Sequence, residues 1–273
     1  MLKKIALGVV LFIYIIILFF SACTNLTKKQ NHISHTRLMD KALKSYENDY
    51  LPYQNFIYIK KYVYFNSEKE NFCKKDDLSL DCEFIPYGEG SGIAVDHIKN
   101  KVRILTAHHV CEEQTWEALS LIYEDEDGEY NYPTFKLKVS FYGGEYDAII
   151  TKTDQDNDLC LLEINSEYGY KVKKIKIAQE KPKTGEIVYS LSAPLGIASD
   201  FTRMKFRGYW AGCDSSLTSE DFCYYTIPAA PGSSGSGVFN QYGELVSIIS
   251  IAMTGFNEIS GGPRQFFIEQ ILK

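Results

Sequence analysis

The most informative segment of the sequence is Pro228-Ala229-Ala230-Pro231-Gly232-Ser233-Ser234-Gly235-Ser236-Gly237-Val238-Phe239. Its run of small residues, 232–236, cannot build a core and would weaken a strand or a helix. Such a run is useful where the backbone must approach another molecule closely. A serine flanked by glycines can expose its hydroxyl while nearby backbone N–H groups converge on one point, which suits a nucleophile beside an oxyanion hole. Taken alone, the segment fits a Gly/Ser turn between strands equally well.

Two distant segments favour the first interpretation. Thr106-Ala107-His108-His109-Val110 places a histidine where a strand candidate ends, and a neutral imidazole is the natural base near pH 7. Asp154-Gln155-Asp156-Asn157-Asp158 stands directly before the apolar run 159–162. Taken alone, the histidine is more simply explained as a structural or surface residue, and the aspartate as a turn residue. Together the three segments follow the order His, Asp, Ser of the chymotrypsin group.

At this point the sequence resembles the trypsin-like serine peptidases, nearest to the HtrA/Deg type. Gly90-Ser91-Gly92-Ile93-Ala94-Val95 is similar to the strand that precedes the family's histidine. The valine that follows His109 favours this residue over His108. The pattern Asp-Leu-x-Leu-Leu at 158–162 favours Asp158 over the two earlier aspartates. The likeness covers roughly residues 85–272.

The segment 232–236 resembles the family's Gly-x-Ser-Gly-Gly motif, which makes Ser234 the expected nucleophile. Two departures lie beside it, since Ser236 replaces a glycine and Gly237 replaces a proline. No activation site like Ile-Val-Gly-Gly is present, so zymogen cleavage of the digestive kind is not implied. The segment after Ser234 is too short for a PDZ domain, and we expect none in this chain.

The resemblance implies an all-β fold of two antiparallel six-stranded β-barrels with the active site between them, followed by a C-terminal helix. His109, Asp158 and Ser234 would form the triad of a serine endopeptidase that works through an acyl-enzyme. The N–H groups of Gly232 and Ser234 would form the oxyanion hole. The implied substrate-binding residues are Pro228 and Ala229 at the base of the primary pocket, and Ser250, Ile251 and Ala252 in an edge strand.

Such an enzyme would act on protein or peptide substrates and would need no metal and no cofactor. No acid stands at the base of the implied pocket, so a small or medium apolar side chain is expected before the cleaved bond, rather than Arg or Lys. Two alternatives remain open. One is a non-catalytic binding module that keeps the barrels, and the other is an envelope interaction protein with an incidental Gly/Ser loop.

The residue pattern itself also predicts an all-β fold, because many short β-rich runs follow one another without long helices between them. We expect a first barrel at 55–165 and a second barrel with the C-terminal helix at 166–273. That helix should begin near Pro263 and face inward with Phe266, Phe267, Ile271 and Leu272. The acidic run 124–127 is expected to be a solvated hairpin tip rather than a calcium loop.

The N-terminus has the features of an export signal. Lys3 and Lys4 precede the apolar run 5–20, and Ser21-Ala22-Cys23 follows. We expect residues 1–22 to be a signal peptide, with lipidation at Cys23, and residues 23–54 to form a tether and a helix. Plain secretion and a retained membrane anchor are the alternatives. The expected location is therefore the cell envelope or periplasm, with the membrane as a partner through the lipid or the apolar segment.

The cysteine count supports export. Apart from Cys23, the chain has six cysteines, an even number that an oxidising compartment favours. Two local disulfides are expected, Cys73 with Cys82 and Cys213 with Cys223. Cys160 lies in an apolar run, where it is equally well a buried free thiol that leaves Cys111 unpaired.

Charge and cysteine spacing exclude other classes. No cysteine pair has the spacing of zinc ligands, so no structural metal is expected. The net charge is -6, the pI is about 5.5, and the sequence has no basic stripe, so nucleic acid is not an expected partner. Nothing in the sequence indicates the oligomeric state.

Overall fold

The computed structural model describes residues 51–64, 85–112, 123–124, 130–131, 134–198, 203–214, 222–253 and 256–273. The expected signal peptide, Cys23, the tether and helix up to residue 50, and the Cys73–Cys82 pair lie outside these residues, as does the tip of the acidic hairpin. The base of that hairpin is described as a short ladder in which β4 (Tyr123–Glu124) pairs with β5 (Tyr130–Asn131).

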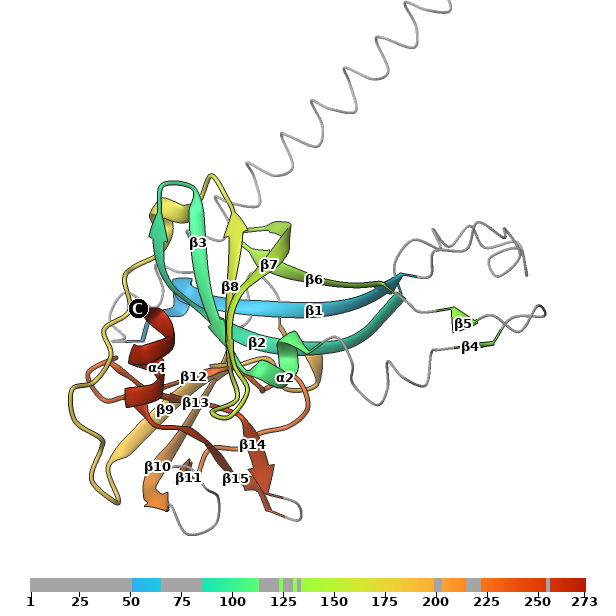
Figure 1. The fold of residues 1–273 in the computed structure, drawn as a ribbon. Helices are drawn as coiled ribbons and strands as arrows, with labels where there is room; N and C mark the ends of the chain where they lie inside the picture. Colours follow the sequence, from blue (N-terminus) through green and yellow to red (C-terminus); the bar gives the residue numbers. More distant parts are fainter. Residues whose placement is uncertain are drawn as a thin grey trace, which may run out of the picture.

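The first half of the protein is a closed, antiparallel, six-stranded barrel (Figure 1). Its strands, in order around the barrel, are β1 (Phe56–Tyr64), β2 (Ile85–Ile98), β3 (Lys101–Thr106), β8 (Leu159–Asn165), β7 (Gly144–Asp154) and β6 (Thr134–Phe141). The β-rich runs 56–59 and 62–64 both belong to the single strand β1, which bulges between Lys61 and Tyr62. Alternate residues of β1, such as Ile57 and Ile59, are fully buried inside the barrel.

The second half is an antiparallel, seven-stranded sheet. Its strands, in sequence order, are β9 (Ile187–Ser192), β10 (Met204–Asp214), β11 (Phe222–Tyr225), β12 (Gly237–Asn240), β13 (Leu245–Ile248), β14 (Ile251–Met253) and β15 (Phe256–Pro263). Side by side, their order is β13-β12-β9-β10-β11-β15-β14. The all-β fold that the resemblance implied is confirmed, with a closed six-stranded barrel in the first half, while the second half is a seven-stranded sheet.

The seventh strand arises because the apolar run 245–251 is divided between β13 and β14. The N–H of Ile249 donates to the carbonyl of Ser236, and the N–H of Ser250 donates to that of Gly261. The stretch therefore pairs with β12 before this break and with β15 after it. Six extended segments thus appear as seven strands, and the break lies against the Gly/Ser segment.

Helix α4 (Gln265–Leu272) lies where the barrel and the sheet meet, and it contacts β7, β8 and β13 (Figure 1). Its buried positions are Gln265, Ile268 and Ile271. Phe266 is 54% exposed, so the expectation that it faces inward is wrong. The buried residues recur every three positions, which leaves Phe266 on the opposite side of the helix.

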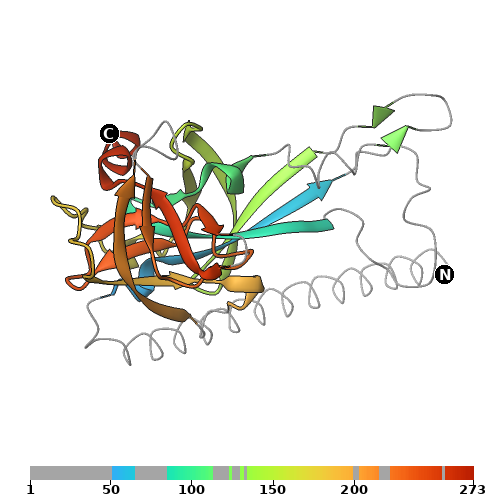
Figure 2. The same ribbon diagram turned by 90° about the horizontal axis from the view of Figure 1, so that it is seen from below.

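Two hydrophobic clusters fill the molecule. The larger one fills the barrel and continues through Leu245, Ile248 and Ile268 into the sheet and α4. The smaller one lies within the sheet around Trp210 and Tyr225. The strands of the second sheet are strongly curved, as the view from below shows (Figure 2). The packing shared by barrel, sheet and α4 fixes the two halves against each other.

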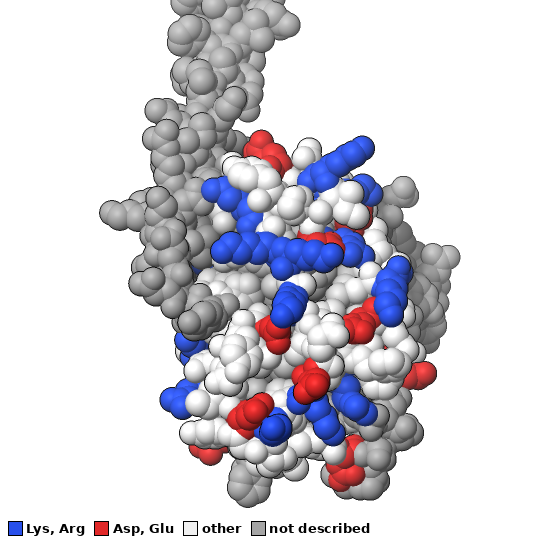
Figure 3. Space-filling model, turned by 90° about the vertical axis from the view of Figure 1, so that its left-hand side faces the viewer, with Lys and Arg blue, Asp and Glu red and all other residues white. Residues whose placement is uncertain are grey.

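The connection between the halves is rich in lysine, with six in residues 169–183. One of them, Lys176, forms an ion pair with Glu244. Figure 3 shows a face of the molecule on which lysine and arginine side chains are interspersed with acidic ones. Among the described residues, no helix is both long and apolar enough to cross a membrane.

Candidate active site

His109 and Asp158 lie in direct contact. His109 is in the one-turn helix α2 (His108–Cys111), which follows β3, and its Nδ1 lies 2.9 Å from Asp158 Oδ2 and 3.1 Å from Oδ1. The backbone N–H of His109 also donates to Asp158 Oδ1 at 2.9 Å. Because a carboxylate only accepts hydrogen bonds, this contact favours the tautomer with the proton on Nδ1. The Nε2 atom of the half-exposed imidazole is then free to act as a base.

The turn before β8 aims the Asp158 side chain at His109. Asp158 has φ of 50°, a left-handed conformation that aspartate tolerates better than most residues, and its N–H donates to Gln155 O. Asp154 holds the same turn by accepting hydrogen bonds from the backbone and the side chain of Asn157. The two aspartates therefore differ in position, since Asp154 braces the turn and Asp158 meets the histidine.

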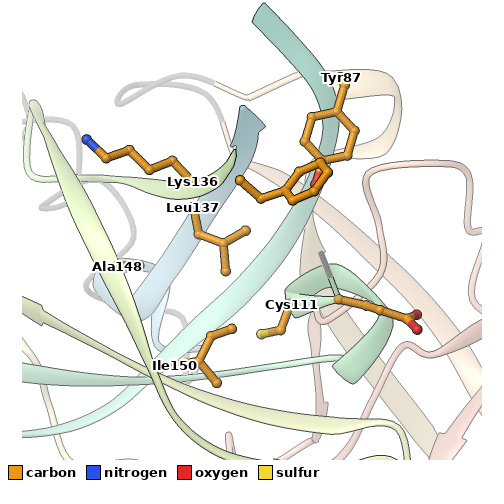
Figure 4. Close-up of a pocket in the computed structure, with 8 residues that line it drawn as sticks. Tyr87, Cys111, Lys136, Leu137, Ala148 and Ile150 are labelled. Carbon is orange, nitrogen blue, oxygen red and sulfur yellow. The ribbon is translucent and has the colours of Figure 1, made fainter. Parts of the chain in front are cut away.

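A disulfide joins the same two segments. Cys111 bonds Cys160, so each half-cystine stands two positions after one member of the histidine–aspartate pair. From the sequence, it remained open whether these two cysteines form a disulfide. The expected Cys213–Cys223 disulfide is also formed. Figure 4 shows Cys111 in the wall of a cavity of about 230 Å³ beside α2, together with Tyr87, Lys136, Leu137, Ala148 and Ile150.

The segment with Ser234 is built from two consecutive turns. The first is closed by a 2.9 Å hydrogen bond from Ser233 N–H to Ala230 O, and the second by a 3.1 Å bond from Ser236 N–H to Ser233 O. Gly232 and Gly235 occupy the third position of each turn, with φ of 90° and 84°. A positive φ at this position is the mark of a type II turn and favours glycine. The glycines of the motif are therefore required by the turns.

This segment packs onto the strands that lead to His109. The carbonyl of Ser234 accepts a 2.8 Å hydrogen bond from Ser91 N–H in β2. A Cβ on Gly235 would collide with Ser91 O and Thr106 Oγ1 and would lie 3.0 Å from Ala107 N, two residues before His109. The fold therefore brings the Ser234 segment to the end of β3, from which the chain continues into α2 and His109.

The backbone N–H groups of Gly232 and Ser234 are the expected donors of the oxyanion hole. Among the hydrogen bonds of the described residues, none is donated by the N–H of Gly232 or of Ser234. These hydrogen bonds also include none between the Ser234 hydroxyl and the His109 imidazole. In a free enzyme such a contact is often long and tightens when substrate binds. These N–H groups can donate hydrogen bonds to a developing oxyanion.

A pocket of about 220 Å³ lies beside Ser234. It is lined by Ala229, Ala230, Pro231, Ser233, Ser234, Ile249, Ile251 and Ala252. Of the expected substrate-binding residues, Ala229, Ile251 and Ala252 line this pocket. Pro228 is exposed and Ser250 is buried, and neither lines it. Ile251 and Ala252 belong to β14, an exposed strand at the edge of the sheet, where an extended peptide can add a strand. The lining has no charged side chain, so it suits an apolar residue.

Two charged residues near the site, Lys61 and Glu89, lie outside the motifs recognised in the sequence. Lys61 is 5% exposed, and its Nζ donates to the backbone carbonyl of His109 at 3.2 Å. Glu89 accepts a 2.5 Å hydrogen bond from the hydroxyl of Tyr58. Burial, together with this bond, raises the pKa of Tyr58 well above its ordinary value. The contacts of both residues depend on β1 pairing with β2.

Ser91 also had no role beyond its place in the Gly-Ser-Gly pattern. It is fully buried, its Oγ donates to Gly232 O at 2.7 Å, and the same Oγ accepts from Ala193 N–H at 3.1 Å. The hydroxyl therefore fixes the peptide that follows Gly232, next to the expected donors of the oxyanion hole. In the described residues, no cluster of three or more His, Cys, Asp or Glu side chains could hold a metal ion.

Replacing Ser91 by alanine is expected to destabilise the protein by about 1–3 kcal/mol, because one buried N–H and one buried C=O lose their partner. The matched control is Ser190→Ala, since Ser190 is equally buried but its Oγ has no hydrogen-bond partner in the described residues. Urea unfolding measures both variants. Equal stability of the two would show that the Ser91 hydroxyl does not hold the segment.

The chain is similar to a known protein family. The family model described as trypsin-like peptidase domain matches residues 90–248, which is more than half of the chain. The matched span contains His109, Asp158 and Ser234. No curated protein matches the chain.

Proposed function

Since the chain belongs to the trypsin-like peptidase family, we propose that it is an exported serine endopeptidase of the HtrA/Deg type. Protein or peptide substrates follow from the family. The observation that carries the proposal is the contact of His109 Nδ1 with the Asp158 carboxylate, at the strand end onto which the Ser234 segment packs. A turn with an incidental glycine-serine run would not need this arrangement.

In the proposed reaction, Ser234 Oγ attacks the carbonyl carbon of the peptide bond while His109 Nε2 takes its proton. The tetrahedral intermediate collapses when the imidazolium returns that proton to the leaving amine. Water, deprotonated by the same imidazole, then hydrolyses the acyl-enzyme. Asp158 holds the imidazole in the required tautomer and stabilises its charged form.

The N–H groups of Gly232 and Ser234 would stabilise the oxyanion, each donor contributing about 3 kcal/mol. Neither group donates a hydrogen bond to another group of the described residues, which supports this role. The pocket beside Ser234 would hold the side chain before the cleaved bond, and its size and apolar lining support a small or medium apolar residue. Strand β14 would pair with the backbone of the substrate.

Export is supported by two observations. The apolar run at 5–20 follows two lysines and precedes Ala22-Cys23, which supports a cleaved signal at 1–22 and lipidation at Cys23. The two disulfides of the described residues are typical of oxidising compartments such as the periplasm or the cell exterior. We propose the cell envelope as its location and domains of 55–165 and 166–273 behind the tether.

A fluorophosphonate probe tests the proposal, because it reacts only with a serine that a neighbouring base activates. The folded protein should be labelled at neutral pH, and the heat-denatured protein should not be. Peptide mass spectrometry should place the label on Ser234, with Ser233 and Ser236 in the same peptide as internal controls. Folded protein that resists the probe would favour a non-catalytic binding module with this fold.

A further inference from the structure

Glu89 holds a carboxylate directly beside the proposed oxyanion hole. Its Oε1 lies 3.2 Å from the position that a Cβ on Gly232 would occupy. Its Oε2 accepts the hydrogen bond from Tyr58, and a Cβ on Gly196 would collide with it. The carboxylate is therefore held between the Ser234 segment and the turn η3 (Pro194–Gly196), while the residue remains partly exposed.

The charge of Glu89 has no positive partner in the part of the chain that the structure describes. There, its only hydrogen bond is the one from the neutral Tyr58 hydroxyl, and no lysine or arginine lies within ion-pair distance. Three other acids of the barrel are paired with a basic side chain: Glu145 with Lys60, Glu163 with Lys101 and Asp96 with Arg103. An unpaired carboxylate beside a site that must stabilise negative charge is unexpected, because like charges repel.

Glu89 lies against Gly232, and neither residue is among those that line the apolar pocket. All residues that line this pocket come from 229–234 and 249–252, and none comes from the barrel. Glu89 reaches Gly232 from β2, next to η3, whose Leu195 N–H donates to Pro231 O. If the pocket holds the residue before the cleaved bond, the residues after that bond leave on the side of β2 and η3.

We propose that Glu89 is a specificity-determining residue that selects a lysine or arginine at the second position after the cleaved bond. The inference rests on the proposed function and extends it to the leaving half of the substrate. An extended peptide advances about 3.3 Å per residue. Since the carboxylate lies against Gly232, the long side chain of either of these residues can reach it.

The same geometry makes Glu89 unfavourable for neutral substrates. Negative charge develops on the oxyanion in the transition state, and a neighbouring carboxylate raises the energy of that state. A substrate cation that binds Glu89 removes this penalty. Loss of the Glu89 charge therefore has opposite effects on two substrates. A peptide whose basic residue would bind Glu89 is cleaved more slowly, and a neutral peptide is cleaved faster.

The experiment measures kcat/KM for three peptides that share the same acyl half and differ only in the second residue after the cleaved bond, which is Lys, Gln or Glu. Wild type, Glu89→Gln and Glu89→Lys are compared. Glu180→Gln is the matched control, since Glu180 is an exposed acid in the connection between the two halves. Titration with the fluorophosphonate probe normalises every preparation to active enzyme, so poor folding of a variant does not enter the result.

Wild type and Glu180→Gln should prefer the Lys peptide over the Gln peptide by about tenfold. In Glu89→Gln this ratio should fall below about twofold, with the Gln peptide cleaved faster than by wild type, and Glu89→Lys should prefer the Glu peptide. Labelled wild type that cleaves all three peptides equally, or Glu89→Gln that keeps the full preference, would overturn the inference and leave the proposed function intact. Absence of both labelling and cleavage in wild type would instead overturn the proposed function, and the inference with it.

Discussion

Replacing Ser234 by alanine is expected to lower kcat for a peptide substrate by about a millionfold, because the proposed mechanism then loses its nucleophile. The fold should persist. The carbonyl of Ser234, which accepts the hydrogen bond from Ser91 N–H, is retained, and alanine fits the half-buried position. Hydrolysis of a fluorogenic peptide measures the activity, and near-UV circular dichroism verifies the fold.

The control for this change is Ser236→Ala in the same segment. Ser236 is fully buried and its Oγ has no partner in the described residues, so the loss of this hydroxyl should change kcat by less than about threefold. If Ser234→Ala retained measurable turnover while Ser236→Ala lost it, the nucleophile would be misassigned. If both variants retained full turnover, the serine mechanism would be wrong.

Asp158→Asn is expected to lower kcat by about 10⁴-fold with little change in stability. Asparagine has nearly the same shape, so its oxygen can still accept the N–H of His109. Its amide, however, carries no negative charge to stabilise the imidazolium, and its NH₂ group favours the tautomer that blocks Nε2 as a base. Active-site titration combined with peptide hydrolysis separates this effect from loss of folded enzyme.

Asp156→Asn removes a charge from the same turn without removing a contact with His109. Asp156 is exposed, so this variant should stay within about twofold of wild type in kcat. Comparable losses in both variants would mean that the general charge of the turn matters and not the contact with the histidine.

The histidine, the aspartate and the serine could be selected from the sequence because each stands in a local pattern. The valine after His109 lies against Gly90, and a Cβ there would come within 2.7 Å of Val110 Cγ1, which explains why the Gly-Ser-Gly and histidine patterns occur together. The turn that orients Asp158 depends on residues 154–158 alone. Local rules therefore locate these side chains.

The contacts made across the fold could not be predicted in this way. Glu89 meets Gly232 only because β2 passes beside the Ser234 segment, and Lys61 reaches His109 from a strand 48 positions away. No pattern in either segment indicates its partner. The division of 245–253 into β13 and β14 likewise depends on a hydrogen bond to the carbonyl of Ser236. Strand propensity alone cannot predict such a distant contact.

The pairing of Cys160 and the exposure of Phe266 depend on packing that local sequence does not specify. Cys160 is fully buried in β8, and an apolar neighbourhood is equally typical of a free thiol and of a half-cystine, so only its proximity to Cys111 decides. In α4, the sequence offers apolar residues on more than one side, and the side that docks on β8 and β13 decides that Phe266 remains exposed.

The cross-link between α2 and β8 couples the thiol redox potential of the surroundings to the conformational stability of this protein. It spans 49 positions, and such a constraint is worth about 4 kcal/mol through the entropy of the denatured ensemble. In a reducing milieu, the hydrogen bonds of Asp158 to His109 would have to hold those segments without covalent help. Formation of this disulfide after synthesis is therefore a maturation step of the protein, and it requires no proteolysis.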